Sequence, residues 1–364
     1  MKILVLIPDA FGGRGGIAKF NQFYLSSLCS YPRTEEVIAF PRKVVDPVGE
    51  LPQKINYIDP QFPSVFSYVK SVVTTIKQYQ SINLIICGHI NILPLAYILS
   101  IWKNAPIYLV IHGVEAWEPC PNKLSNMLID KLDGIITVSE LTKNRFLTWS
   151  QCFDIDSYLL PNTFDMSSFK PGNKSFSLVQ RYQLQNRTVI LTLGRLESLE
   201  QYKGFDEVID VLPILIEDIP NLTYLISGDG SDRSRLESKV KALGLQEYVV
   251  FTGYVPEEEK SDHYRLADAY VMPSQGEGFG IVYLEAMACG IPVVGSKLDG
   301  SSEALRGGSL GILVDPKDSE ELVSGILAAL KYPKGIVPDG LDYFSIENFN
   351  KRCHSILDEI CKKK

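Results

Sequence analysis

The sequence predicts an α/β protein built from two doubly wound parallel-sheet domains that face each other across a cleft. Three observations support this fold class. The chain has 364 residues, which exceeds the size at which a single core usually stops growing. Uninterrupted apolar runs alternate with helix-like runs, which is typical of strands buried on both faces of a sheet. The alternation stops once near the middle of the chain and then restarts.

The first half of the chain contains four strand-and-helix pairs. Strands are predicted at 2–8, 83–89, 107–113 and 134–139, and helices at 17–29, 93–102, 124–132 and 140–149. The uncharged stretch 82–102 is long enough to imitate a membrane span. Its asparagines, histidine and proline divide it instead into a buried strand, a polar turn and a buried helix.

A polar stretch at 165–185 contains Pro-Gly and little periodicity, and we interpret it as a linker. The second half then repeats the pattern. Strands are predicted at 188–196, 222–230, 248–255, 269–274 and 291–296, with helices at 206–216, 235–244, 258–267 and 282–288. We therefore expect domains at 1–168 and 169–346, and a last amphipathic helix at about 347–364. Ligands of such sheets bind beyond the carboxyl ends of the strands.

The composition of the chain excludes several classes of function. The net charge is −7 and gives no electrostatic footprint for nucleic acid. Residues 1–170 are nearly neutral, with 15 Lys and Arg against 14 Asp and Glu, whereas the remainder has 21 against 29. The seven cysteines are scattered and lack metal-binding spacing. The start MKILVLIPDA reads as a buried strand rather than a signal peptide. We expect a cytoplasmic protein without a metal site.

The segment EGFGIVYLE places Glu277 and Glu285 around a Gly-Phe-Gly turn between a strand and a helix. Backbone amides at the start of such a helix can bind a phosphate oxygen. Two carboxylates would repel phosphate but suit neutral polyols on either side of it, which describes a nucleotide diphosphate sugar. The alternative is an ordinary strand–helix connection carrying two solvated acids.

Cleavage of a sugar–phosphate bond requires stabilisation of the departing diphosphate. Arg195 follows a predicted buried strand, and Lys203 precedes a glycine and a helix start. A guanidinium binds phosphate through two hydrogen bonds, while an ammonium acts as a point charge. These two residues are the candidate cations, although each alone could be an ordinary surface charge.

The loop FGGRGGIA supplies another glycine-rich connection, at the start of the first domain. It also matches a dinucleotide-binding fingerprint, which makes a nicotinamide-dependent oxidoreductase the main alternative. Two details weaken that reading: PDAF separates the strand from the glycines, and the acids Glu35 and Glu36 precede the second strand rather than end it. We favour a loop that closes over a ligand held mainly by the other domain.

Several polar residues follow predicted strands of the first domain. His112 lies where it could contact a transferred sugar, although a structural role is the usual one for a single histidine. Ser139, Thr142 and Asn162 also follow strands, and each could equally be a helix cap or a turn residue.

These residues resemble a known family. GRL at 194–196, KGFD at 203–206, GDG at 228–230 and above all PSQGEGFGIVYLEAMACGIPVVGS at 273–296 are similar to the retaining GT-B glycosyltransferases of family four. The resemblance covers nearly the whole chain and is more specific in the second half. One departure occurs at 299–303, where Asp-Gly-Ser-Ser-Glu replaces the frequent Gly-Gly-x-x-Glu.

The resemblance implies two Rossmann-like domains, with the donor nucleotide on the second, the acceptor on the first, and the last helix returning to the first. It implies that Glu285 binds ribose hydroxyls, Glu277 the transferred sugar, and Arg195 and Lys203 the diphosphate. Further implied contacts to the donor come from both domains: Gly278, Phe279, Gly280, Gly15, Gly16 and His112.

The expected activity is metal-independent hexose transfer with retention, from a nucleotide diphosphate sugar to a saccharide or lipid-linked saccharide. UDP-glucose is the expected donor, and polysaccharide or cell-envelope glycan synthesis the expected setting. No cofactor is expected. Apolar residues of the first domain allow peripheral contact with the inner face of a membrane: Phe62, Val65, Phe66 and Tyr68. A non-catalytic sugar-nucleotide binding protein remains a third possibility.

Overall fold

The computed structural model describes residues 1–58 and 64–363, which form two compact units. The N-terminal unit comprises residues 1–163 and 346–364, and the C-terminal unit comprises residues 164–345. Residues 164–168, which the sequence analysis assigns to the first domain, lie in the C-terminal unit. The reason is aromatic packing, since the ring of Phe169 lies 6.3 Å from Phe164 and 6.0 Å from Tyr264.

The described part of the N-terminal unit contains an entirely parallel sheet with the strand order β3-β2-β1-β4-β5-β6-β7. Its strands are β1 (Lys2–Ile7), β2 (Glu36–Pro41), β3 (Ile55–Tyr57), β4 (Leu84–Cys87), β5 (Ile107–Ile111), β6 (Gly134–Thr137) and β7 (Asp156–Leu159). The chain order reverses between β1 and β4, which is where ligands bind in such sheets.

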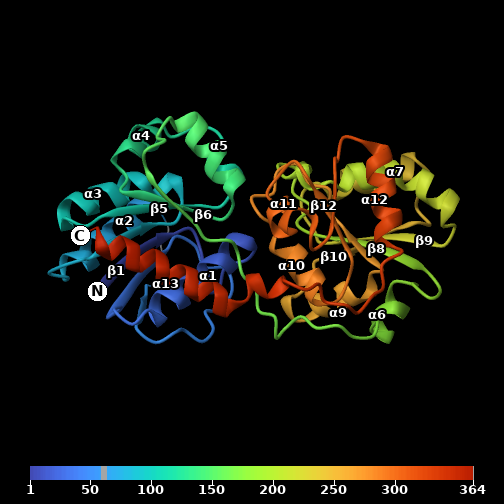
Figure 1. The fold of residues 1–364 in the computed structure, drawn as a ribbon, viewed down its shortest axis with the longest axis horizontal. Coiled ribbons are helices and arrows are strands. Elements are labelled where there is room, and N and C mark those ends of the chain that lie inside the picture. Colours follow the sequence, from blue (N-terminus) through green and yellow to red (C-terminus); the bar gives the residue numbers. More distant parts are fainter. Residues whose placement is uncertain (59–63, 364) are drawn as a thin grey trace. The chain divides into compact units, whose positions relative to one another are not determined.

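Helices cover both faces of this sheet (Figure 1). They are α1 (Gly16–Ser30), α2 (Val65–Lys77), α3 (Leu93–Lys103), α4 (Lys123–Met127), α5 (Glu140–Ser150) and α13 (Ile346–Lys362), with short 3-10 turns η1 (Ile90–Ile92), η2 (Val114–Ala116) and η3 (Ile129–Lys131). The stretch 82–102 forms β4, η1 and α3, so the predicted strand, turn and helix are confirmed. In the described residues, no helix combines the length and apolarity needed to cross a bilayer.

The C-terminal unit repeats the architecture, with parallel strands in the order β10-β9-β8-β11-β12-β13. The strands are β8 (Thr188–Leu193), β9 (Leu222–Ser227), β10 (Val249–Gly253), β11 (Ala269–Val271), β12 (Val293–Ser296) and β13 (Ile312–Val314). Here the order reverses between β8 and β11. The two sheets confirm the predicted pair of Rossmann-like α/β domains.

Helices of the C-terminal unit also lie on both faces of its sheet (Figure 1). They are α6 (Phe176–Arg181), α7 (Phe205–Asp218), α8 (Arg233–Ala242), α9 (Lys260–Leu266), α10 (Ile281–Ala288), α11 (Ser301–Ala304) and α12 (Ser319–Ala329), with the turns η4 (Gln201–Lys203), η5 (Glu257–Glu259), η6 (Arg306–Gly308) and η7 (Leu341–Phe344). The predicted linker 165–185 therefore contains a helix, α6, which buries Leu178.

The strand runs explain the core of each unit. In β1, every residue from Ile3 to Ile7 is buried, and β9 is buried along its full length. A strand covered by helices on both faces needs apolar side chains at successive positions rather than at alternate ones. The uninterrupted apolar runs of the sequence are therefore accounted for by sheets that are covered on both sides.

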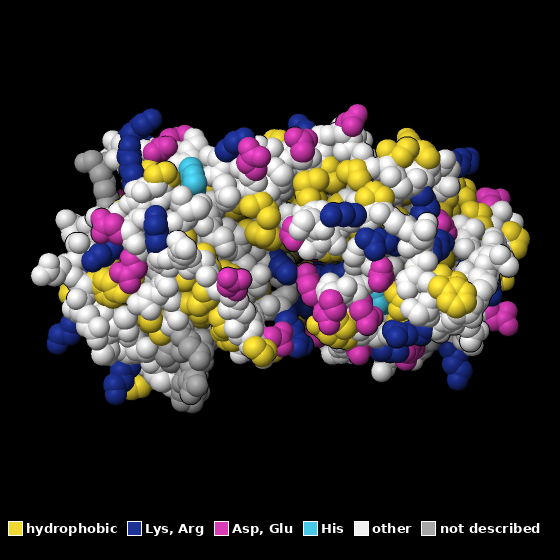
Figure 2. Space-filling model, turned by 90° about the horizontal axis from the view of Figure 1, so that it is seen from below, with side chains coloured by type: hydrophobic (Ala, Val, Ile, Leu, Met, Phe, Trp, Pro, Cys, Tyr) yellow, Lys and Arg dark blue, Asp and Glu magenta, His cyan; other side chains and the backbone are white. Residues whose placement is uncertain are grey.

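Charged and hydrophobic side chains are mixed on the surface. On the face shown in Figure 2, Lys and Arg lie among Asp and Glu, and hydrophobic side chains form separate patches. Apolar atoms make up more than half of an ordinary protein surface. These patches alone therefore do not mark a binding site.

The helix α13 completes the core of the N-terminal unit although it follows the C-terminal unit in sequence. It lies beside α1 (Figure 1). The fully buried ring of Phe349 meets Phe20 edge-on at 5.8 Å. The hydroxyl of Tyr31, a buried residue, donates a 2.7 Å hydrogen bond to Asp358 of α13.

Replacing Phe349 with alanine tests this packing. We expect Phe349→Ala to lower the free energy of unfolding of the N-terminal unit by about 3–5 kcal/mol, because it leaves a cavity against α1. Phe66→Ala, on the exposed side of α2 (78% exposed), should change it by less than about 0.5 kcal/mol. Urea unfolding of the whole chain measures both, and equal effects would contradict the packing.

Candidate active site

The candidate donor site lies at the carboxyl edge of the C-terminal sheet, at the point where the strand order reverses. Arg195 follows β8, and the loop 274–280 follows the neighbouring strand β11. The turn η4 carries Lys203 just before α7. The sheet therefore brings together residues that are about 80 positions apart in the sequence.

A network of ion pairs joins these segments. The ammonium of Lys203 lies 2.6 Å from Oε1 of Glu277 and 3.6 Å from Oε2 of Glu200. Glu200 also pairs with the guanidinium of Arg195. Lys203 is largely buried, with 13% of its side chain exposed, whereas Arg195 is 65% exposed. The predicted cations thus lie around one carboxylate, and Arg195 presents its guanidinium to solvent.

The charge of Lys203 is secured by its partners. Burial alone would lower the pKa of the ammonium, but the nearby carboxylates of Glu277 and Glu200 outweigh burial and raise it to about 12. Lys203 therefore remains positively charged at neutral pH. A permanent buried cation at this edge of the sheet is suited to hold an anionic group of a ligand.

The loop 274–280 is fixed by close backbone packing. The amide of Gln275 donates to the carbonyl oxygen of Tyr202 at 2.7 Å, and a Cβ on Gly276 would lie 2.5 Å from the ring of Tyr202. At the end of the loop, Gly280 has φ 89° and precedes α10. A Cβ there would lie 2.4 Å from the ring of Tyr283, so glycine is required.

The remaining predicted residues of this loop differ in accessibility. Gly278 is partly exposed, whereas Phe279 is 2% exposed and its ring meets Phe344 edge-on at 5.4 Å. The side chain of Phe279 thus supports the loop from inside. Its predicted contact with a donor stays a prediction, and the side chain does not offer that contact in this geometry.

Glu285 lies on α10 and is only 3% exposed. Its Oε2 accepts a 2.7 Å hydrogen bond from the hydroxyl of Tyr264, and the ammonium of Lys260 lies 3.7 Å from Oε1. These partners hold a carboxylate that would otherwise be costly to bury. A fixed carboxylate is able to accept hydrogen bonds from two neighbouring hydroxyl groups of a ligand.

In the N-terminal unit, His112 follows β5 at the carboxyl edge of its own sheet. The ring is 8% exposed and meets Phe20 edge-on at 5.0 Å. Its Nε2 has no hydrogen-bond partner among the described residues. Burial lowers the pKa of His112, and His89 adds to the effect while Glu115 and the backbone of Gly88 oppose it. The imidazole is therefore neutral at pH 7.

The other predicted residues of the N-terminal unit have mixed roles. Ser139 caps α5: its buried hydroxyl accepts from the amide of Thr142 at 3.1 Å and donates to the hydroxyl of Thr142 at 2.8 Å. The helix-cap alternative thus describes Ser139, and its contact with substrate stays untested. Asn162 is 8% exposed, and its Oδ1 has no partner among the described residues.

The glycine loop before α1 is open. Gly15 has φ 92°, and a Cβ on Gly15 or Gly16 would have no neighbour within 4 Å. Arg14 of the loop is held by Asp46 through hydrogen bonds of 2.7 and 2.6 Å. Gly15 is thus required by its backbone conformation, and the space around both glycines leaves room for a ligand.

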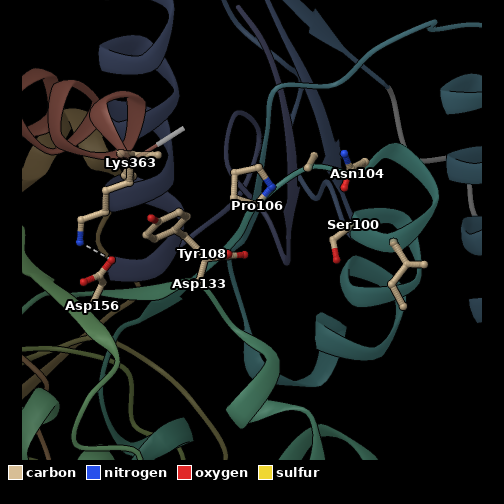
Figure 3. A pocket seen from close by; sticks show the side chains of 10 residues that line it. Ser100, Asn104, Pro106, Tyr108, Asp133, Asp156 and Lys363 are labelled. Atoms are coloured by element: carbon tan, nitrogen blue, oxygen red, sulfur yellow. Dashed lines mark hydrogen bonds and ion pairs between the residues drawn. The ribbon is translucent and has the colours of Figure 1, made fainter.

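A cavity of about 490 Å³ lies elsewhere in the N-terminal unit (Figure 3). It is lined by residues at the amino ends of β5, β6 and β7, together with the ends of α3 and α13. Figure 3 shows Asp133 and the ion pair between Asp156 and Lys363 beside it. His112, Ser139 and Asn162 lie at the opposite ends of these strands, so this cavity is not the predicted site.

Sequence reasoning missed four residues that shape the candidate site. Glu200, Lys260 and Tyr264 contact the predicted cations or Glu285, and Asp299 binds the loop that carries Glu277. The departure from Gly-Gly at 299–300 was the sequence signal for Asp299. Across residues 1–58 and 64–363, no group of three or more His, Cys, Asp or Glu side chains is placed to hold a metal ion.

Two Rossmann-like units, with paired cations and a buried carboxylate at the carboxyl edge of the second, define the class of GT-B glycosyltransferases. The comparison with known proteins agrees with this assignment to the GT-B glycosyltransferases. Residues 178–336 match the model of a family described as "Glycosyl transferases group 1". These residues include every predicted site residue of the C-terminal unit.

Two of the relatives by sequence are named as mannosyltransferases. The chain is 32% identical, over 71% of each protein, to the GDP-mannose-dependent alpha-(1-6)-phosphatidylinositol monomannoside mannosyltransferase of Mycolicibacterium smegmatis. It is 36% identical to the phosphatidyl-myo-inositol mannosyltransferase of Mycobacterium leprae, over 56% of this chain and 51% of that protein. This second match thus spans about half the length of the relative.

Solved structures share the fold. The Anabaena protein HepE in complex with UDP-glucose superimposes with a TM-score of 0.77 at 22% identity, over 99% of this chain and 100% of that one. Sucrose-phosphate synthase from Thermosynechococcus elongatus gives 0.77 at 20% identity, over the full length of both chains. The chain belongs to the group 1 glycosyl transferases, the GT-B glycosyltransferases of family four, and transfers a sugar from a nucleotide sugar.

The hydrogen bond between Tyr264 and Glu285 can be tested by stability. Removing the hydroxyl in Tyr264→Phe should lower the free energy of unfolding by about 1.5–3 kcal/mol, because the lost bond reaches a buried charged group. Tyr270→Phe is the matched control. Its hydroxyl donates to the neutral carbonyl of Leu193 at 3.3 Å, so the loss should be about 1 kcal/mol. Equal losses in thermal or urea unfolding would contradict the bond to Glu285.

Proposed function

We propose that this glycosyltransferase moves a hexosyl group with retention, and without a metal ion, from a nucleoside diphosphate hexose to a saccharide or lipid-linked saccharide acceptor. Polysaccharide or cell-envelope glycan synthesis is the proposed setting. The observation that carries the proposal is the ion-pair network of Arg195, Lys203, Glu200 and Glu277 at the reversal point of the C-terminal sheet. The buried carboxylate of Glu285 lies on α10, the helix that follows the loop of Glu277.

Each residue of the group suits one part of such a donor. Arg195 and Lys203 provide positive charge for the diphosphate, and both charges persist at neutral pH. The buried carboxylate of Glu285 accepts hydrogen bonds from the ribose hydroxyls. Glu277, held by Lys203, accepts from hydroxyls of the transferred sugar. Gly278, Phe279 and Gly280 would contribute through the backbone of the loop, since the ring of Phe279 is buried against Phe344.

The proposed chemistry takes place on one face of the sugar. The bond between the anomeric carbon and the leaving phosphate oxygen breaks while the acceptor oxygen bonds to that carbon from the same side. The acceptor proton passes to an oxygen of the leaving diphosphate, whose added charge Arg195 and Lys203 stabilise. Glu277 and Glu285 already have hydroxyl groups to bind, so neither is needed as a nucleophile.

Residues of the N-terminal unit complete the proposal. The neutral imidazole of His112 has a free ring nitrogen that can bind a hydroxyl of the transferred sugar. Gly15 and Gly16, at the start of α1, leave open space beside the backbone in which a ligand can lie. The amide oxygen of Asn162 has no partner among the described residues and can accept a hydrogen bond from a hydroxyl group of the acceptor saccharide. Ser139 can contact a substrate only if its hydrogen bonds to Thr142 break.

Two nucleoside diphosphate hexoses are the candidate donors. The sequence analysis predicts UDP-glucose, and the fold neighbour from Anabaena was solved with that donor. The relative from Mycolicibacterium smegmatis is named for GDP-mannose, and its higher identity makes GDP-mannose the second candidate. Both carry a hexose on a nucleoside diphosphate and fit the same grouping of charges.

Membrane contact is a further proposal for a lipid-linked acceptor. Val65 and Phe66 begin α2 and are 66% and 78% exposed, whereas Tyr68 is 3% exposed and belongs to the core. Phe62 lies outside the described residues. The exposed pair is therefore the part of the predicted apolar surface that can meet a bilayer.

Release of free nucleotide tests the donor site directly. Incubation with a panel including UDP-glucose and GDP-mannose should yield UDP or GDP from one donor, equally with and without EDTA. Arg195→Ala and Lys203→Gln should lower kcat/KM by about 10²–10³-fold, because each removes charge from the leaving diphosphate. Lys297→Gln should change kcat/KM by less than about twofold, since Lys297 is exposed and pairs with Glu321 on α12.

Several outcomes would contradict the proposal. Loss of nucleotide release in EDTA would show that a metal is required. Binding of NAD or NADP, without binding of any nucleoside diphosphate in calorimetry, would favour the oxidoreductase alternative. Donor binding without release, in the presence of a broad acceptor panel, would favour a sugar-nucleotide binding protein.

The stereochemical course is a separate prediction. With an α-linked donor, proton NMR of the first product should show the new glycosidic bond in the α configuration, because attack and departure occur on one face. A β-linked first product would exclude the proposed mechanism. A glycosyl group trapped on a side chain would indicate two displacements instead of one.

A further inference from the structure

A buried carboxylate, that of Asp299, holds the loop 274–280, which we call the donor loop. Asp299 follows β12, is 0% exposed, and accepts hydrogen bonds from four donors. Its Oδ2 accepts from the hydroxyl of Ser274 at 2.7 Å and from the amide of Glu277 at 2.8 Å. Its Oδ1 accepts from the amide of Ser301 at 3.0 Å and from the hydroxyl of Ser301. One side chain thus joins the loops that follow β11 and β12.

Backbone contacts make this junction tight. The amide of Gly300 donates to the carbonyl oxygen of Glu277 at 2.8 Å, and a Cβ on Gly300 would lie only 2.1 Å from the carbonyl oxygen of Gly278. Both backbone groups of Glu277 are therefore held, its amide by Asp299 and its carbonyl oxygen by the amide of Gly300. Its carboxylate reaches Lys203 from that fixed backbone.

We propose that ionised Asp299 is a positioning residue for the donor loop: it fixes the backbone of Glu277, and donor turnover falls when Asp299 becomes protonated. This inference rests on the proposed donor site at Glu277 and Lys203. It assigns to position 299 a task that a glycine there, as in Gly-Gly-x-x-Glu, has no side chain to perform.

The charges around Asp299 set the conditions for protonation. Burial raises the pKa of Asp299 to about 6, and the carboxylate of Glu277 adds to this effect, while the hydrogen bonds from Ser301, Ser274 and the Glu277 amide oppose it. The phenol of Tyr283 on α10 also faces this carboxylate, and burial, with a smaller contribution from Asp299, raises the pKa of that phenol. Lys203 contacts Glu277, the neighbour of Asp299 in this network.

Protonation of Asp299 affects its hydrogen-bond donors unequally. A serine hydroxyl can rotate and accept a hydrogen bond from a protonated carboxyl group, whereas the backbone amide of Glu277 can only donate. Hydrogen bonds to a charged acceptor are also stronger than bonds to a neutral one. The link to the Glu277 backbone is therefore weakened when Asp299 takes up a proton.

Stability changes in the opposite direction to activity. Asp299 holds its proton up to about pH 6 in the folded chain, whereas an unfolded aspartate loses it near pH 4. The folded state thus binds more protons between these values, and the free energy of unfolding decreases as the pH rises through this window. Above pH 6 the buried carboxylate of Asp299 is ionised and lowers the free energy of unfolding. A neutral side chain at position 299 should therefore still allow the chain to fold.

The test is the pH dependence of donor hydrolysis in Asp299→Asn. The original chain should lose kcat/KM below about pH 6, with a single acid limb. The side chain of asparagine has one acceptor oxygen and one NH2 group. The NH2 group must therefore face the backbone N–H of either Glu277 or Ser301, which is a donor opposite a donor. We expect kcat/KM at pH 7.5 to fall about tenfold or more, the acid limb to disappear, and the melting temperature at pH 7.5 to be retained or raised.

Two serine variants keep the test decisive if Asp299→Asn does not fold. Ser274→Ala and Ser301→Ala each remove a hydroxyl that stabilises the carboxylate, so the acid limb should move to higher pH in both. Both hydroxyls lie outside the residues proposed to contact the donor. An unchanged limb in both variants would overturn the inference.

The possible outcomes distinguish a failure of the inference about Asp299 from a failure of the proposed function. Absence of donor turnover at every pH would overturn the proposed function itself. Turnover with the same acid limb and rate in Asp299→Asn would overturn only the role of Asp299. The source of the limb would then be His112, whose pKa burial lowers. If Asp299→Asn loses activity together with its melting temperature at pH 7.5, the acid limbs of Ser274→Ala and Ser301→Ala decide: a shift to higher pH supports the inference, and an unchanged limb shows a purely structural role.

Discussion

The ion pair between Lys203 and Glu277 is the interaction on which the candidate site depends. It joins the turn before α7 to the loop after β11, at 2.6 Å and with less than a fifth of either side chain exposed. Two charges buried this far are tolerated only while each has the other as a partner. The pair therefore ties donor-loop geometry to the fold of the C-terminal unit, and Glu200 extends it to Arg195.

Much of the fold follows from the sequence because its signals are local. Apolar runs such as Ile3–Ile7 predict strands covered on both faces, and their alternation with helices predicts parallel sheets. The segment 165–185 shows the limit of such reasoning. Its polar composition predicts a linker, yet Leu178 gives α6 enough apolar surface to pack in the C-terminal unit. A single buried side chain leaves no periodic pattern.

The candidate site was only partly predictable, because its partners are distant in sequence. Arg195, Lys203, Glu277 and Glu285 are visible as charged residues next to strand ends. Nothing in the sequence pairs Glu285 with Tyr264, twenty-one positions earlier, or buries the ring of Phe279 against Phe344. Ser139 shows a different limit: a polar residue that follows a strand and precedes a helix fits both a ligand contact and an N-cap, and only coordinates distinguish them.

The place of α13 in the chain has a consequence for synthesis. The N-terminal unit needs Phe349 beside Phe20, yet the ribosome makes the whole C-terminal unit between these two residues. While residues 164–345 emerge, α1 lacks the helix that covers it and exposes apolar surface. Domains usually fold in the order of their synthesis. Here the N-terminal unit is begun before the C-terminal unit and completed after it, so its nascent form must stay unaggregated until α13 has left the ribosome.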